Sequence, residues 1–153
     1  MKKLLMILLL GLLVTGCGTG NKVSKDNQDD GKNGGGAGIV AGEMAASLTE
    51  KSPLVFQYEV KNQTEEEVTL EFTSSQRYDY SVKTKDGKEI FLFSSVASFL
   101  QALGEETVKQ GESLTYEIDL HELKLGKGDY ILTAWMTPKD GKKFEVTKEF
   151  TVK

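Results

Sequence analysis

Residues 54–61 read LVFQYEVK, and this stretch decides the fold class because large apolar side chains occupy every second position. Leu54, Phe56, Tyr58 and Val60 share one parity, and the polar Gln57, Glu59 and Lys61 share the other. Successive side chains of a strand point to opposite faces of the sheet, so a period of two predicts a strand with one buried face. The segment is therefore expected to be a half-buried β-strand.

The same period recurs along the chain, between spacers rich in turn-forming residues. The pairs Asp86-Gly87 and Asp140-Gly141 are typical of tight β-hairpins. About seven to eight short strands at intervals of roughly 8–12 residues predict an all-β, immunoglobulin-like antiparallel β-sandwich, formed by a single domain at 43–153. The further expected strands are 68–72, 78–82, 114–120, a central strand at 130–137, 144–146 and 150–152.

One stretch departs from the alternation. In residues 96–103, VASFLQAL, the apolar residues Val96, Phe99, Leu100 and Leu103 follow the spacing i, i+3, i+4, i+7. This is the period of a helix with one apolar face. We therefore expect one short helix inside a long inter-strand crossing.

The chain begins with a basic, then an apolar, then a small-residue segment. Lys2 and Lys3 precede the uncharged run LLMILLLGLLV at 4–14. A basic start, about 7–15 apolar residues and small residues at the end are typical of a secretory signal peptide. The run is shorter than the roughly 20 apolar residues needed to span a bilayer. Residues 1–16 are thus expected to form a signal peptide that is cleaved.

Cys17, the chain's single cysteine, follows Val14-Thr15-Gly16. This run resembles the lipobox of bacterial lipoprotein precursors, which implies that the Cys17 thiol receives a diacylglyceryl group and becomes the mature N-terminus. Two acyl chains such as palmitate anchor a protein stably, whereas one alone is marginal. The alternative is an ordinary cleaved signal with a spare thiol. A catalytic thiol is disfavoured because a nucleophile needs a positioned base.

Residues 18–42 hold eight of the 16 glycines of the chain, with few large aliphatic side chains. Such a composition cannot bury enough apolar surface to fold, so 17–42 is expected to be the lipidated cysteine followed by a flexible linker. The glycine run at 34–38 lacks the Gly-Lys-Ser/Thr continuation of a phosphate-binding loop, which argues against a nucleotide ligand.

Charge and composition exclude other classes of function. The formal net charge is −4, which is not the basic footprint of a nucleic-acid-binding protein. His121 is the only histidine, and Asp119 and Glu122 are the acids nearest to it in the sequence. Metal sites usually need three or four converging ligands, so these residues are weak evidence for a metal site. No catalytic triad stands out. We expect no metal, no cofactor and no enzymatic activity. A hydrolase of the cell envelope is the alternative in which the protein would be an enzyme.

Two polar and aromatic stretches are candidates for partner binding. One is SQRYDY at 75–80, and the other is EIFLFS at 89–94, which runs into the expected helix. An internal role is open, with Arg77 paired to an acid and the rings in the core. A binding surface is also open, since interfaces favour Arg and aromatic side chains. The candidate partner-binding residues are Arg77, Tyr78, Phe91, Phe93, Ser94 and Phe99.

The run from Asn62 to Met136 contains a series of short motifs in a fixed order: Asn62, LEF at 70–72, SQRYDY at 75–80, DGKE at 86–89, FLFS at 91–94, FLQAL at 99–103, QGES at 110–113 and GDY at 128–130. In order and spacing, these motifs resemble the intracellular proteinase inhibitor (BsuPI) family. That resemblance implies an immunoglobulin-like β fold and inhibition of a serine proteinase of the subtilisin type. The founding members are cytoplasmic, whereas the start of this chain predicts export.

Together these features predict a non-enzymatic protein that a lipid anchors to the outer face of the cell membrane. Its expected activity is inhibition of a proteinase, with the crossing at 94–104 as the contact. The alternative is a binding or scaffolding module for another cell-envelope protein.

Overall fold

The computed structural model describes residues 42–153. These residues form nine β-strands and two short 3₁₀ turns. The predicted signal peptide at 1–16, the lipid attachment site Cys17 and the linker up to residue 41 lie outside the described residues. The elements are β1 (Met44–Ser52), β2 (Val55–Asn62), β3 (Val68–Phe72), β4 (Tyr78–Thr84), β5 (Glu89–Leu92), η1 (Phe93–Ser95), β6 (Gly104–Val108), β7 (Ser113–Asp119), η2 (His121–Leu123), β8 (Gly128–Met136) and β9 (Lys143–Val152).

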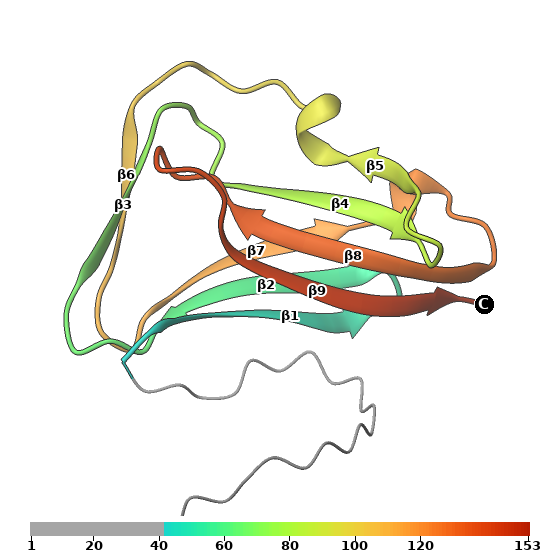
Figure 1. The fold of residues 1–153 in the computed structure, drawn as a ribbon, viewed down its shortest axis with the longest axis horizontal. Helices are drawn as coiled ribbons and strands as arrows, with labels where there is room; N and C mark the ends of the chain where they lie inside the picture. The colour runs from blue at the N-terminus through green and yellow to red at the C-terminus, as the bar shows by residue number, and fades with distance from the viewer. Residues whose placement is uncertain (1–41) are drawn as a thin grey trace, which may run out of the picture. The chain divides into compact units, whose positions relative to one another are not determined.

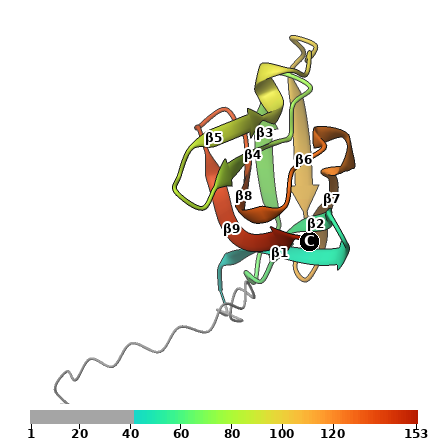
Figure 2. The same cartoon turned by 90° about the vertical axis from the view of Figure 1, so that its right-hand side faces the viewer.

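The strands form an antiparallel sandwich, as the alternation predicted. One sheet has the order β1-β2-β7 and the other the order β5-β4-β8-β9. This is the immunoglobulin-like arrangement of a three-stranded sheet against a four-stranded one, with one additional pair, β3-β6. In Figures 1 and 2, β3 and β6 stand side by side at one end of the sandwich and run across the other strands.

The core lies between the two larger sheets, and the period of two places the same face of each strand in it. In β2 the buried residues are Phe56, Tyr58, Val60 and Asn62. Burying a large apolar side chain contributes about 1.5–3 kcal/mol, so a chain without disulfides can depend on such a core. The remaining core residues are Leu48, Leu70, Phe72, Tyr80, Val82, Val108, Ile118, Leu120, Leu132, Ala134, Met136 and Phe150.

The central-strand prediction for 130–137 is confirmed, because β8 pairs with β4 on one side and β9 on the other. Its second face is partly covered: Trp135 is half-buried, and the Lys142 ammonium group lies 3.8 Å from its ring centre. The predicted segments 144–146 and 150–152 are one continuous strand, β9. Strands β1 and β6 were not predicted, and β5 corresponds to the internal role that was open for the stretch 89–94. The count is nine rather than seven or eight.

The helix predicted at 96–103 is absent, and this prediction was wrong. The crossing holds only the 3₁₀ turn η1, and residues 97–103 have no regular secondary structure. The apolar side chains at helical spacing do not form a buried face, since Val96, Leu100 and Leu103 are 67%, 75% and 87% exposed. The Leu100 backbone is hydrogen-bonded in both directions to Ser75, which lies just before β4 and outside the crossing.

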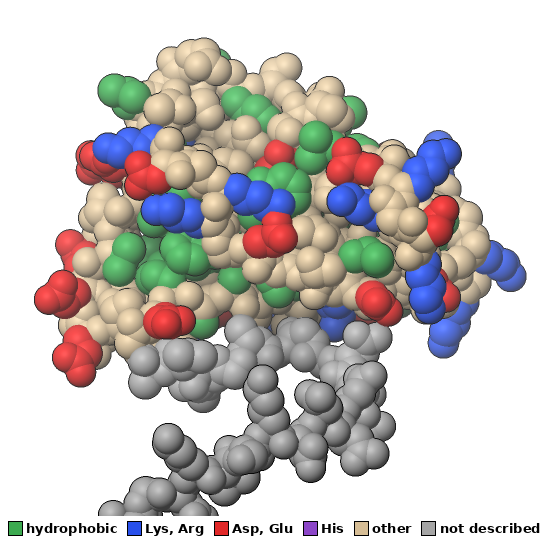
Figure 3. All heavy atoms as spheres, in the orientation of Figure 1, with side chains coloured by type: hydrophobic (Ala, Val, Ile, Leu, Met, Phe, Trp, Pro, Cys, Tyr) green, Lys and Arg blue, Asp and Glu red, His purple; other side chains and the backbone are tan. Residues whose placement is uncertain are grey.

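The crossing from η1 to β6 and the start of β1 lie on opposite sides of the molecule (Figure 1). The β3-β6 pair connects these two sides, because β3 begins near the start of β1 and β6 begins at the end of the crossing (Figure 1). Figure 3 shows a face on which acidic and basic side chains are interspersed, with apolar side chains in small patches between them.

Candidate functional site

The structure brings the six predicted partner-binding residues together beside β4, between its start and Val82, the residue that pairs with Phe91. Arg77 and Tyr78 lie at the start of β4, Phe91 is in β5, and Phe93 and Ser94 are in η1. Phe99 lies in the crossing, where its ring meets that of Phe93 edge to face at a centroid distance of 5.7 Å. The residues thus form one cluster, but most of their contacts are with one another and with the core.

Arg77 is partly buried and makes several internal contacts. Its Nε donates to the Glu106 carboxylate at 2.8 Å, and one terminal nitrogen donates to the Ser74 carbonyl oxygen at 2.8 Å. The guanidinium carbon lies 4.6 Å from the ring centre of Phe72. The group also packs against Gly104, where an added Cβ would come within 2.5 Å of it. Arg77 therefore ties the start of β4 to β6, which is the internal role that the sequence left open.

The aromatic residues form a continuous row from the core to the crossing. Tyr116 stacks on Tyr78 at 4.5 Å between centroids, and Tyr78 stacks on Phe93 at 5.7 Å. Tyr80 lies 5.0 Å from Phe93 and 5.6 Å from Phe91. Stacked and edge-to-face pairs each stabilise by about 0.5–1.5 kcal/mol beyond their buried area. The row therefore fixes η1, and through Phe99 the crossing, to the sandwich.

Burial of this row changes the acidity of its hydroxyl groups. Desolvation raises the pKa of Tyr116 to about 12, with a smaller contribution from the Glu106 carboxylate. Desolvation also raises the pKa of Tyr80 to about 12, helped by the neighbouring Tyr78 and by Asp119 and Asp79. Because burial penalises the charged form, both phenols stay neutral well above the pH at which an exposed tyrosine ionises.

Asp79 supports the first turn of the crossing, a role that the sequence did not assign to it. It is buried, at 6% exposure, and its Oδ1 accepts from the Ser94 amide at 3.0 Å and from the Tyr80 amide at 2.9 Å. A carboxylate that accepts backbone N–H groups satisfies donors that a short turn leaves unpaired. Asp79 lies in the SQRYDY stretch, but the local sequence does not indicate which distant backbone group its carboxylate binds.

Ser75 holds the middle of the crossing. The Ser75 amide donates to the Leu100 carbonyl oxygen at 2.8 Å, and the Leu100 amide donates to Ser75 Oγ at 2.9 Å. The Ala102 amide also donates to the Leu100 carbonyl oxygen, at 3.0 Å. These bonds fix the Leu100 backbone while its side chain remains 75% exposed. The crossing is thus held at Ser94, at Phe99 and at Leu100, and it presents apolar side chains outward.

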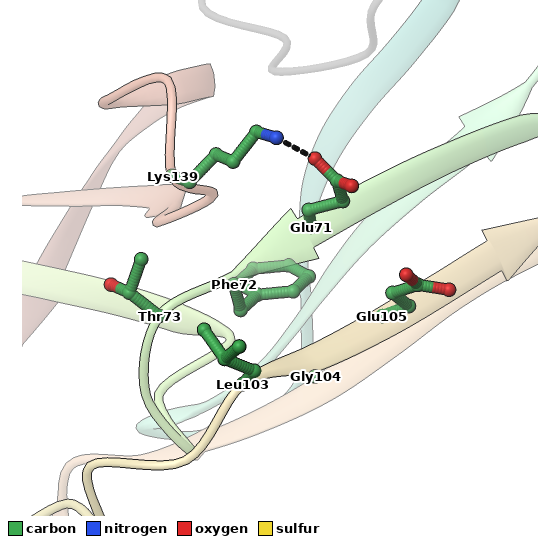
Figure 4. Close-up of a pocket in the computed structure, with 7 residues that line it drawn as sticks. All are labelled: Glu71, Phe72, Thr73, Leu103, Gly104, Glu105 and Lys139. Carbon is green, nitrogen blue, oxygen red and sulfur yellow. Dashed lines mark ion pairs between the residues drawn. The ribbon is translucent and has the colours of Figure 1, made fainter.

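A hollow of about 470 Å³ lies beside the end of the crossing, between β3, β6 and the turn before β9 (Figure 4). Phe72 lies at its centre, and Leu103 lies at its edge (Figure 4). Lys139 forms an ion pair with Glu71 at one side, and Glu105 projects from β6 (Figure 4). The hollow combines an apolar floor with a charged rim, directly next to the exposed Leu103.

Comparison with known proteins shows the family to which this domain is similar. The family model for BsuPI, described as intracellular proteinase inhibitor, matches residues 42–141. The chain belongs to the BsuPI family. A search of curated proteins found no match to the chain. The match to the BsuPI model ends in the turn before β9, yet β9 pairs with β8 along most of its length and completes the larger sheet.

Asn62, the last residue of β2, is a buried corner of the BsuPI domain. Its side-chain amide donates to the carbonyl oxygens of Glu66 at 2.7 Å and Val108 at 2.8 Å. Its Oδ1 accepts from the Thr64 amide at 2.9 Å and from the Thr64 hydroxyl at 2.7 Å. All the hydrogen-bonding capacity of the amide is therefore used where the chain leaves β2 for β3.

His121 follows β7 of the BsuPI domain and contacts one acid. Its amide and its Nδ1 both lie within hydrogen-bond distance of Asp119 Oδ1, at 2.9 and 2.6 Å. These bonds lower the pKa of Asp119, the backbone bond most. Residues 42–153 hold no group of three or more His, Cys, Asp or Glu placed to bind a metal. Across the same residues, no helix has the length and apolar character to cross a bilayer.

Proposed function

We propose that this protein inhibits a serine proteinase of the subtilisin type, and that the crossing at 94–104 enters the proteinase cleft. Membership of the BsuPI family supports inhibition of a proteinase in general. The observation that carries the proposal is the crossing itself. It is an irregular segment held at Ser94, Phe99 and Leu100, and it exposes the side chains of Val96, Leu100 and Leu103. A segment ordered before binding loses little conformational entropy on binding, which favours a tight complex.

The test is a titration of subtilisin with the purified full-length protein in mild detergent. We expect activity to fall linearly to zero at a fixed stoichiometry and to return slowly on dilution. A variant in which residues 96–103 are replaced by a glycine-serine segment of equal length should lose inhibition and keep the folded domain. Rapid degradation of the wild-type protein, with full proteinase activity retained, would contradict inhibition and favour the scaffolding module for another envelope protein.

We also propose that the mature protein is exported and held at the outer face of the cell membrane by lipid on Cys17, with 17–42 as a flexible tether to the domain at 43–153. The motif at 14–17 supports this, together with the apolar run before it and the glycine-rich segment after it. Metabolic labelling with a palmitate analogue tests it. The wild-type protein should take up label and sediment with membranes, and Cys17→Ala should do neither. Label on the Cys17→Ala protein would refute the assignment.

A further inference from the structure

The crossing exposes three large apolar side chains, and their backbones differ in a way that selects one of them. When a proteinase binds a substrate-like segment, one side chain fills its primary specificity pocket, and the carbonyl oxygen of that residue enters the oxyanion hole. The flanking backbone pairs with the enzyme as an added strand. The residue at this position therefore needs an exposed side chain and backbone groups that are not already hydrogen-bonded.

Val96 and Leu100 do not meet this requirement. Val96 ends η1 with φ −118° and ψ −19°, and its amide donates to the Phe93 carbonyl oxygen at 3.1 Å. The carbonyl oxygen of Leu100 accepts from the Ser75 and Ala102 amides, and its own amide donates to Ser75 Oγ. Binding either residue in a proteinase cleft would require these bonds to break. Leu100 is therefore an anchor of the crossing.

Leu103 meets the requirement for an exposed side chain and backbone groups that are not already hydrogen-bonded. It is 87% exposed, more than any other large hydrophobic residue described. Among the described residues, nothing hydrogen-bonds to its amide or carbonyl group. It directly precedes Gly104, whose pairing with Phe72 begins the β3-β6 ladder. The hollow of Figure 4 lies beside it and leaves room for a partner.

The peptide bond between Leu103 and Gly104 is also held from both sides. On one side Ser75 fixes Leu100, three residues before the bond. On the other side Gly104 pairs with Phe72, and the Arg77 guanidinium packs against its Cα. A bond whose two flanks are anchored to the same domain stays in place in an active site, which is what slow release requires.

We infer that Leu103 is the specificity-determining residue of this inhibitor and that it enters an apolar primary pocket, with the Leu103–Gly104 bond at the catalytic serine. This inference rests on the proposed inhibition. An apolar pocket accepts leucine and rejects a charged side chain, whereas a pocket with an aspartate at its base, as in trypsin, prefers arginine or lysine.

Substitutions to Asp at three apolar positions test the inference with the full-length protein and subtilisin. Leu103→Asp should weaken inhibition by more than about 100-fold, since a carboxylate is rejected by an apolar pocket. Leu100→Asp should weaken it less. Ile90→Asp, a control at an exposed position in β5, should leave it unchanged. Leu103→Arg should gain inhibition of trypsin, and Leu100→Arg should not.

The outcomes separate the two proposals. If the wild-type protein inhibits no serine proteinase, the proposed function fails. If it inhibits subtilisin but Leu100→Asp weakens inhibition more than Leu103→Asp, or if only Leu100→Arg inhibits trypsin, the function stands and the role of Leu103 is overturned. Mass spectrometry of a long-incubated complex adds a second readout, because the first cut should fall between Leu103 and Gly104. A first cut elsewhere in the crossing would also overturn it.

Discussion

At the scale of single residues, Asn62 and Gln63 are adjacent amides in opposite situations. The Asn62 side chain is completely buried and all its hydrogen bonds are made, as described above. The Gln63 Oε1 atom is buried and has no hydrogen-bond partner among residues 42–153. Leaving buried polar groups unpaired costs about 1–3 kcal/mol each, so the two side chains should respond differently to truncation.

We expect Asn62→Ala to lower the free energy of unfolding by about 2–4 kcal/mol, because it leaves the Glu66 and Val108 carbonyl groups and the Thr64 amide without their partner. Gln63→Ala is the matched control and should change stability by less than about 1 kcal/mol. Urea unfolding followed by circular dichroism measures both. Equal losses for the two variants would show that Asn62 does not hold the corner.

Gly104 and Arg77 should be coupled. An added Cβ at Gly104 would lie 2.5 Å from a guanidinium nitrogen, so Gly104→Ala must displace a side chain that is bonded to Glu106 and Ser74. We expect a loss of about 1–3 kcal/mol in the wild-type background and a much smaller loss when Arg77 is already alanine. A double-mutant cycle by urea unfolding measures the difference. Additive losses would contradict the contact.

At the scale of elements, the crossing from η1 to β6 is an irregular segment that hydrogen bonds and ring contacts hold to the sandwich at a few residues. We expect Ser75→Ala to raise the hydrogen-exchange rate of the Leu100 amide by about 2–10-fold, since a hydrogen bond of about 0.5–1.5 kcal/mol is lost. Ser98→Ala, in the same crossing at an exposed position, is the control. Global stability should be nearly the same in both variants. An unchanged hydrogen-exchange rate at the Leu100 amide would show that the Ser75 hydroxyl does not stabilise the crossing.

The strands that could be predicted from the sequence are those with one continuous apolar face. β2 and β8 have such faces, and their alternation identified them. β6 reads GEETV and buries only Val108 fully, so a two-residue period in side-chain polarity is missing. It forms because the β3 backbone lies alongside it, and a pairing of distant segments leaves no mark in local composition.

The candidate site was predictable in composition but not in geometry. Arg77, Tyr78, Phe93 and Phe99 do lie together, but Arg77 is committed to Glu106 and Gly104. The anchors Ser75 and Asp79 act through backbone groups of a distant segment, which local sequence does not reveal. The helix prediction at 96–103 was wrong for the same reason. Apolar residues at helical spacing form a buried helix face only when another part of the molecule covers that face.

At the scale of the whole molecule, the buried tyrosines make stability depend on alkaline pH. The pKa values of Tyr80 and Tyr116 are raised from 10.0 to about 12, and that of Tyr58 is raised as well, mainly by burial. Above pH 10 the unfolded chain loses these protons while the folded chain keeps them. The tyrosine contribution is therefore fully present below pH 10 and is lost as the pH rises through about 12.

We expect the free energy of unfolding to fall between pH 10 and 12 by at most about 1.4 kcal/mol per pH unit for each such tyrosine, and by less for Tyr116, because its partly exposed side chain is screened by solvent. Tyr116→Phe should make this slope shallower, by at most the contribution of one titrating proton. Urea unfolding at a series of pH values, at constant ionic strength, provides the measurement. The same slope in the wild-type and Tyr116→Phe proteins would show that this hydroxyl is not desolvated.

The position of the crossing in the chain has a consequence for the connectivity of the three sheets. A single break after Leu103 would separate a piece containing β1 to β5 from a piece containing β6 to β9. Every sheet draws strands from both pieces, since β7 pairs with β2, β6 with β3 and β8 with β4. Two fragments made separately should therefore assemble into the same sandwich, and the domain can lose the continuity of its backbone at this point without losing its fold.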